Sequence, residues 1–230
     1  MEAFFTLGPS ILAVSTALAI TLYSWNRLRV LSYITLAWVG VSLAVGQINF
    51  FSPLFSWQST DLLGFMIFGT LAFTPAGLLL YMSYRNAKFK KFLAKIPSSA
   101  LIATQIYRIG GVFLILAYTQ GSLPWSVGLV SGVLDVIVAI AAVILTWYLA
   151  QGNKAPKLVS VWARLSLLDF AWAILVISAS FFGLISVSPA LSAMGNPPLL
   201  IISLFAMPLS IFISVVVLLR MRSKNSTSHK

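Results

Sequence analysis

Seven apolar runs, each about twenty residues long, constrain the fold of this chain more than any other feature. An α-helix needs about 20 mainly apolar residues to cross the roughly 30 Å of hydrocarbon in a bilayer. The connections between the runs are short, and none is long enough to form a soluble domain. The pattern predicts an all-α fold: one seven-helix transmembrane bundle over residues 1–222, followed by a short polar basic tail at 223–230. The runs lie at 4–23, 30–51, 61–84, 99–120, 125–149, 161–185 and 198–221.

The composition agrees with a membrane setting and excludes several kinds of cofactor site. Only 8% of the 230 residues are charged and 60% are hydrophobic, whereas soluble domains have about 25% charged residues. The chain has no Cys, and its one His, His229, lies in the polar tail. A disulfide, an Fe–S cluster and a haem or metal held by buried imidazole are therefore excluded. We expect no cofactor and no metal.

The basic residues lie on alternate sides of the apolar runs. Fourteen of the fifteen fall at the connections after the first, third and fifth runs, or at the C-terminal end. The other connections and the N-terminal segment contain none. Cytoplasmic segments carry the excess of Lys and Arg, so we expect the N-terminus outside and the C-terminus in the cytoplasm of a prokaryotic plasma membrane. The fourteen are Arg27, Arg29, Arg85, Lys88, Lys90, Lys91, Lys95, Lys154, Lys157, Arg164, Arg220, Arg222, Lys224 and Lys230.

The same distribution argues against a nucleic-acid partner. The net charge of +11 is high enough to suggest one. The basic residues, however, are not interleaved with aromatic side chains as in a nucleic-acid groove. The sequence therefore predicts the lipid bilayer as the partner.

Apart from the charges at the ends of the runs, three charged residues lie inside them: Arg108, Asp135 and Asp169. A charge at the centre of a bilayer costs about 2.5–3.5 kcal/mol even on the most lenient scale, so such residues pair internally or face water. Arg108 and Asp135 lie near the middle of two runs that a short connection joins as antiparallel neighbours. The sequence therefore predicts an ion pair between them.

Asp169 is the unbalanced charge of the three, and it is predicted to lie on the cytoplasmic side of the centre of its run. It follows Arg164 by five residues, a spacing that does not put two side chains on one helix face. One Arg against two Asp leaves the interior one negative charge in excess, so we expect Asp169 to take up a proton or a cation. A static ion-pair network that fixes helix register explains the same residues, and the sequence does not choose between the two.

Small and polar residues accompany these charges on their helix faces. Thr104 and Gln105 lie on the side of Arg108, and Ser131 lies on the side of Asp135. A thinner stripe of serines lies along the last run, at 203, 210 and 214. Small and hydroxyl residues allow close helix approach and hydrogen bonds within a membrane. The predicted binding residues are Arg108, Asp135, Asp169, Gln105, Ser131 and Thr104.

Two kinds of known intramembrane chemistry lack the residues they need. Retinal would need a Lys in the seventh run for a Schiff base, and residues 198–219 contain none. Gly132 to Asp135, together with Leu168-Asp169, is similar to the paired aspartates of GxGD proteases. The second glycine and the PAL motif are absent, and the two carboxyls are predicted at different depths. Pro75 and Pro208 fall within apolar runs, where each predicts a kink.

One resemblance covers more of the chain. The segment Gln105-Ile106-Tyr107-Arg108-Ile109-Gly110-Gly111, Gly132 to Asp135, and Leu168-Asp169 resemble a recurring pattern in small prokaryotic integral membrane proteins of uncharacterised activity. The resemblance spans about residues 100–220. It implies that Gln105, Arg108, Asp135 and Asp169 belong to one constellation, and it brings no activity with it.

The sequence favours a membrane protein whose polar, charged interior binds or passes a small solute, proton or cation, as a transporter or channel does. One alternative is a non-catalytic subunit or assembly factor of a membrane complex, held by a membrane-protein partner or a second copy of the chain. A second is an intramembrane lipid-modifying enzyme with an Asp as general acid or base. No residue pattern indicates a catalytic centre, so a non-enzymatic role is favoured.

Overall fold

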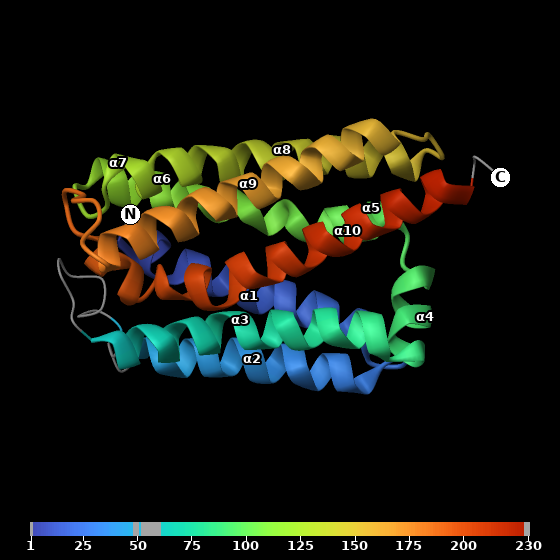
Figure 1. The fold of residues 1–230 in the computed structure, drawn as a ribbon, viewed down its shortest axis with the longest axis horizontal. Coiled ribbons are helices and arrows are strands. Elements are labelled where there is room, and N and C mark those ends of the chain that lie inside the picture. The colour runs from blue at the N-terminus through green and yellow to red at the C-terminus, as the bar shows by residue number, and fades with distance from the viewer. Residues whose placement is uncertain (1, 48–50, 52–60, 228–230) are drawn as a thin grey trace.

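A computed structural model describes residues 2–47, 51 and 61–227, and within them the side chains of 7–47, 51 and 61–221. The described chain is all-helical and contains no strand. Its long helices run side by side along one axis (Figure 1). Seven helical spans are long and apolar enough to cross a membrane. They are α1 (Glu2–Ser24), α2 (Arg29–Gln47), α3 (Leu62–Arg85), α5–η2–α6 (Ser98–Thr119), α7–α8 (Trp125–Ala150), α9 (Pro156–Phe181) and η4–α10 (Ile202–Thr227).

All seven predicted spans are present as helices, and the sixth and seventh differ most from the predicted bounds. α9 begins at Pro156, five residues before the predicted start, because proline suits the first position of a helix, where its missing N–H has no partner to lose. Asp169 consequently lies near the middle of α9 and not on the cytoplasmic side of its centre, which corrects the predicted depth. In the second span, residues 48–50 lie outside the described part.

A short helix that the apolar runs do not predict lies between the third and fourth spans. α4 (Ala87–Lys95) begins at Asn86, whose side chain accepts a hydrogen bond of 3.0 Å from the backbone N–H of Phe89. It buries Phe89, Phe92 and Leu93 and exposes most of its lysines. In Figure 1 it stands across the end of the bundle near the C-terminus. Its amphipathic composition is typical of a helix that lies in a membrane interface.

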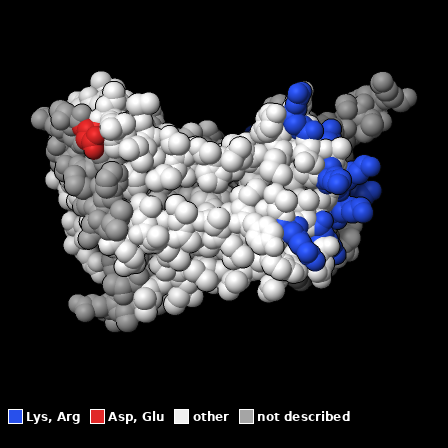
Figure 2. Space-filling view, turned by 90° about the horizontal axis from the view of Figure 1, so that it is seen from below, with Lys and Arg blue, Asp and Glu red and all other residues white. Residues whose placement is uncertain are grey.

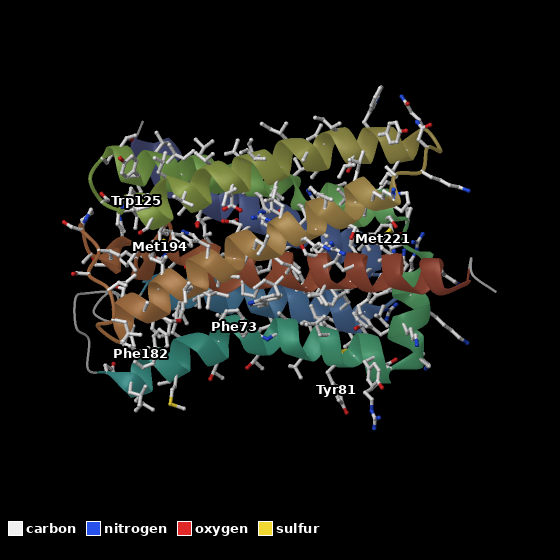
Figure 3. All side chains as sticks on the ribbon, turned by 45° about the horizontal axis from the view of Figure 1, so that its top comes forward. Phe73, Tyr81, Trp125, Phe182, Met194 and Met221 are labelled. Carbon is white, nitrogen blue, oxygen red and sulfur yellow. The ribbon has the colours of Figure 1, made fainter. Side chains whose placement is uncertain are left out.

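Charge is separated along the bundle axis. Figure 2 shows Lys and Arg side chains gathered at one end and an acidic side chain at the opposite end, with an uncharged surface between them. Asp61 is the acidic residue that caps α3, where its carboxylate accepts a 2.8 Å hydrogen bond from Gly64 N. Figure 3 shows Trp125, Phe182 and Met194 near one end, and Tyr81 and Met221 towards the other.

The fourth span is not a continuous α-helix. A 3-10 segment, η2 (Thr104–Gly110), separates α5 (Ser98–Ala103) from α6 (Gly111–Thr119). A 3-10 helix has three residues per turn, so side chains three apart lie directly in line. Gln105 and Arg108 are three apart, and they are the two buried residues of η2. The local winding therefore aims both side chains at the interior.

The last span begins with a π-helical segment, η4 (Ile202–Ala206), just before Pro208. Proline has no N–H to donate to the carbonyl four residues earlier, here that of Leu204. The indole N–H of Trp38 on α2 donates to this carbonyl instead, at 2.7 Å. A side chain thus satisfies the backbone group that Pro208 leaves free, at the irregular point where a kink is predicted. α3 remains helical on both sides of Pro75.

Candidate functional site

Arg108 is the centre of a buried ion network. Its Nε donates to Asp135 Oδ1 at 2.5 Å, its Nη2 donates to Asp169 Oδ2, and its Nη1 donates to Ser166 Oγ. The exposed fractions are 3% for Arg108, 7% for Asp135 and 1% for Asp169. One guanidinium therefore holds two carboxylates and a hydroxyl away from solvent and lipid.

Four of the seven spans contribute to this network. η2 carries Arg108, α8 (Val130–Ala150) carries Asp135, and α9 carries Ser166 and Asp169. The fourth is α10 (Met207–Thr227), whose Ser214 hydroxyl lies 2.9 Å from that of Ser166. The Arg108 guanidinium also lies over the ring of Phe170 on α9, 4.2 Å from its centroid, in a cation–π arrangement.

A second polar link joins η2 to α10 beside the network. The Tyr107 hydroxyl lies 2.6 Å from the carbonyl oxygen of Ala206 and also contacts the Ser210 hydroxyl. Neighbouring residues of η2 thus bind different helices: Arg108 holds α8 and α9, and Tyr107 holds α10. The serine stripe predicted along the last span provides the α10 partners of both networks.

Close contact between α6 and α8 brings Asp135 to Arg108. A Cβ atom added at Gly111 would lie 2.5 Å from the Gly132 carbonyl oxygen and 2.5 Å from Asp135 Cβ. One added at Gly128 or Gly132 would meet the fourth span in the same way. Glycines permit this approach because they have no side chain to separate the two backbones. Gly111 directly follows η2, so the contact point lies one helical turn from Arg108.

The structure places Arg108 against Asp135, as their depth in neighbouring helices predicts. It also places Asp169 on the same guanidinium, as the predicted constellation implies, and corrects only the predicted depth of Asp169. The error came from the helix start, since a start at Pro156 moves Asp169 to the middle of α9. Each carboxylate binds a different nitrogen of the Arg108 guanidinium.

The other three predicted binding residues, Thr104, Gln105 and Ser131, lie in different surroundings. The Thr104 hydroxyl donates to the carbonyl of Leu101 in its own helix, and its side chain lines a separate apolar cavity with Leu101 and Phe212. Thr104 therefore lies outside the ion network, and its role in binding stays a prediction. Gln105 is fully buried, and within the described residues neither its amide nitrogen nor its amide oxygen has a hydrogen-bond partner. Ser131 is buried and lies beside both carboxylates, on the wall of a small cavity.

That cavity has a volume of about 30 Å³ and is lined by Asp135, Asp169, Ser131 and Ser203, with apolar side chains around them. Three buried oxygen atoms on its lining residues make no hydrogen bond of regular geometry to the described residues: Asp169 Oδ1, Ser131 Oγ and Ser203 Oγ. The Ser131 hydroxyl nevertheless lies near enough to the Asp169 carboxyl to interact with it. A cavity needs roughly 10–15 Å³ and two to four polar partners to hold a water molecule. This one has the room and the partners for a water molecule or a small cation.

Ser166 is the network residue that sequence reasoning missed. It precedes Asp169 by three residues, so the two share a helix face. A lone serine in an apolar helix commonly bonds its own backbone, and this weakened the signal. The spacing from Asp169 is the feature that could have identified it.

The fold and the site together define a class: a multi-pass α-helical membrane protein with a charged network in its interior. Residues 65–222 match a family described as a domain of unknown function, DUF8737. The match covers more than half of the chain, which therefore belongs to this family. All residues of the network lie within the matched range, and α1 and α2 lie before it. No curated protein and no solved structure matches the chain.

Proposed function

We propose that this protein is transporter-like or channel-like, and that its interior binds a proton or a small monovalent cation beside Asp169. One observation carries the proposal. Three buried oxygens without hydrogen-bond partners among the described residues belong to residues that line one small cavity, at the edge of a network with two carboxylates and one guanidinium. The unbalanced negative charge and the oxygen ligands together suit a small cation.

The unpaired oxygens weigh against a purely static network. At least nine in ten buried polar groups in proteins have a hydrogen-bond partner, and each one without a partner requires an explanation. A network that only fixed helix register would be most stable with every group satisfied. A water molecule in the cavity would satisfy Asp169 Oδ1, Ser131 Oγ and Ser203 Oγ as a cation would. Only a cation or a proton also balances the second carboxylate, and this charge favours it over a static, hydrated network.

The size of the cavity narrows the range of ligands. Sites for drug-sized molecules measure about 300–1,000 Å³, and the space beside Asp169 measures about 30 Å³. An organic solute or a lipid headgroup does not fit there. The site therefore favours a proton or small cation over the broader class of small solutes, and it gives no support to a lipid-modifying enzyme that uses these two Asp residues.

The proposed orientation places the basic end of the bundle in the cytoplasm of a prokaryotic plasma membrane, with the N-terminus outside. The gathering of Lys and Arg at one end supports it (Figure 2), because cytoplasmic ends carry the excess of these residues. Arg108, Asp135 and Asp169 then lie near mid-membrane, where a charge serves as a binding or relay group.

The first prediction concerns Asp169→Asn. In liposomes that contain the purified protein and a pH-sensitive or cation-sensitive dye, this change is expected to abolish the flux that the parent protein catalyses. Loss of the carboxylate removes both the excess negative charge and one ligand of the cavity. The matched control is Asp61→Asn, because Asp61 lies at a helix N-terminus on the surface and asparagine caps a helix as well as aspartate does.

Two results would contradict this prediction. Equal flux in the parent protein and in Asp169→Asn would show that the cavity is not on the path. Absence of flux in the parent protein, together with a stoichiometric protein partner after mild extraction, would support the membrane-subunit hypothesis instead.

The second prediction separates binding from folding. Ser131→Ala combined with Ser203→Ala removes two unpaired buried hydroxyls, so it is expected to leave the melting temperature without cation unchanged or slightly raised. A cation at about 100 times its Kd stabilises the parent fold by about 2.7 kcal/mol, on the order of 5 °C in melting temperature. The double variant should lose most of that rise in a panel of Li⁺, Na⁺ and K⁺ at constant ionic strength.

Ser42→Ala provides the control for this experiment. Ser42 is a buried serine on α2 that bonds the carbonyl of Trp38, outside the cavity lining. Its replacement should leave the cation-dependent rise intact. An equal rise in the parent protein and the double variant would exclude the two hydroxyls as ligands.

A further inference from the structure

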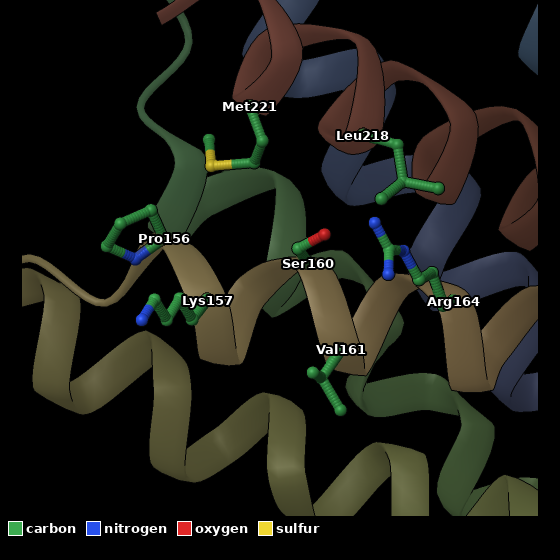
Figure 4. Close-up of a pocket in the computed structure, with 7 residues that line it drawn as sticks. All are labelled: Pro156, Lys157, Ser160, Val161, Arg164, Leu218 and Met221. Atoms are coloured by element: carbon green, nitrogen blue, oxygen red, sulfur yellow. The ribbon is translucent and has the colours of Figure 1, made fainter. Parts of the chain in front are cut away.

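A groove lies at the basic end of the bundle, between α9 and α10. It has a volume of about 600 Å³. Its polar wall consists of Lys157, Ser160 and Arg164 from α9, and its apolar wall consists of Val161, Leu218 and Met221 (Figure 4). This groove is separate from the cavity beside Asp169 and is about twenty times larger.

The three polar residues share one face of α9. They lie three, four and seven residues apart, the spacings that bring side chains together on a helix. Side chains of a helix lean towards its N-terminus, so that of Arg164 extends back towards Ser160 and the basic end. In Figure 4 the Arg164 guanidinium and the Ser160 hydroxyl point into the space between the two helices.

Arg164 has no anionic partner in the described part of the chain. The sequence contains four acidic residues: Glu2, Asp61, and the two carboxylates already bound by Arg108. Within the described residues Arg164 makes no ion pair and no hydrogen bond. Arg220 on α10 provides a contrast, because its guanidinium donates to the carbonyls of Leu93 and Ile96 at the end of α4.

An apolar stripe continues along α9 from the groove towards the middle of the span. Val161, Leu168 and Leu175 repeat every seven residues, and the side chain of each is more than 60% exposed at the bundle surface. Residues seven apart lie on almost the same line of a helix. A molecule with a negative headgroup and a long apolar chain matches both the groove and the stripe.

We infer that this groove binds an anionic phospholipid, with its phosphodiester against Lys157, Ser160 and Arg164 and an acyl chain along the stripe. Basic pockets between transmembrane helices on the cytoplasmic side bind phosphate headgroups in this way. Arginine suits the phosphate because its planar guanidinium donates two parallel hydrogen bonds. The groove is also large enough for a glycerol phosphate headgroup. Binding here does not depend on ion binding beside Asp169.

Native mass spectrometry of the full chain, after incubation with equal amounts of phosphatidylglycerol and phosphatidylcholine, tests this inference. The parent protein should retain phosphatidylglycerol preferentially. Lys157→Gln combined with Arg164→Gln should bind it roughly thirtyfold more weakly, since each basic residue near the surface contributes about fivefold. The control is Lys88→Gln combined with Lys91→Gln, which removes the same charge from exposed positions on α4 and should leave retention unchanged.

Two further measurements separate loss of the lipid site from loss of the fold, and a lipid site from a simple phosphate site. Arg164 has no described partner to lose, so the groove variant should melt as the parent does in detergent without added lipid. Soluble glycerol phosphate in excess should fail to displace the lipid, because it cannot occupy the apolar stripe. Equal retention of the two lipids, equal loss in the control pair, or displacement by glycerol phosphate would each overturn the inference.

Discussion

Arg108→Met is expected to lower the free energy of unfolding by about 3–5 kcal/mol, because it leaves two buried carboxylates without a positively charged partner. Asp135 and Asp169 each bind a different nitrogen of the Arg108 guanidinium, and within the described residues no other cation contacts them. Methionine fills much of the same volume, so the loss comes from charge and hydrogen bonding rather than from a hole. Thermal denaturation of the purified protein in a mild detergent, followed by circular dichroism, measures the effect.

A charge-balanced variant separates the two possible causes of this loss. Arg108→Met combined with Asp135→Asn and Asp169→Asn removes all three charges at once. Replacing a complete buried ion network by neutral groups is often close to neutral for stability, so the triple variant should recover most of the lost melting temperature. It should not recover cation binding. Arg85→Met, at an exposed position in the last turn of α3, should melt as the parent does.

An Arg108→Met protein that melts at the parent temperature would contradict the central role of the guanidinium. A triple variant as unstable as the single one would show that shape and hydrogen bonding, rather than charge balance, hold the four helices together. Both results bear on the architecture alone, since neither requires a transported ion.

The pairing of Arg108 with Asp135 was predictable because it depends only on depth and on a short connection. The depth of Asp169 was not, because it depends on where α9 begins. Apolar residues become continuous at Val161, but the helix starts at Pro156. Lys157 and Ser160 are polar residues of the first turns and do not interrupt the helix. Hydropathy locates the apolar part of a span, whereas capping and proline chemistry decide its end.

Thr104 illustrates a different limit. In a regular α-helix, residues four apart share a face, so Thr104 is expected beside Arg108. The 3-10 winding of η2 advances each residue by a third of a turn, which aligns Gln105 with Arg108 and turns Thr104 away. No proline lies in this segment that would predict the change from α-helical to 3-10 winding. It arises next to Gly111, which allows a tight approach to α8, and that contact is a tertiary effect.

The short helix α4 could have been predicted from its residues. Phe89, Phe92 and Leu93 lie three and four residues apart among lysines, a spacing typical of an amphipathic helix. A search for membrane spans passes over it, because nine residues are too few to cross a bilayer. The high charge density of the segment then makes it look like a loop.

Gly111→Ala is expected to destabilise the protein by about 1–3 kcal/mol, and to do so by separating α6 from α8. The added methyl group would lie 2.5 Å from the Gly132 carbonyl oxygen and from Asp135 Cβ. Neither atom is the end of a flexible side chain, so a helix must move. Overpacking of this kind costs about 1–3 kcal/mol. The displaced atoms include Asp135, so the contact between Asp135 and Arg108 should lengthen, and cation binding beside Asp169 should weaken with it.

The control for Gly111→Ala makes the sign of the effect decisive. Gly69→Ala is the same substitution inside α3, where an added Cβ meets nothing within 4 Å. Alanine is favoured over glycine in a helix interior by about 1 kcal/mol, so Gly69→Ala should melt at the parent temperature or above it. Opposite shifts for the two variants in a thermal melt would show that the α6–α8 contact, and not glycine flexibility, sets the cost. A Gly111→Ala protein that is as stable as Gly69→Ala would mean that the two helices can separate freely, and the geometry that brings Asp135 to Arg108 would then need another cause.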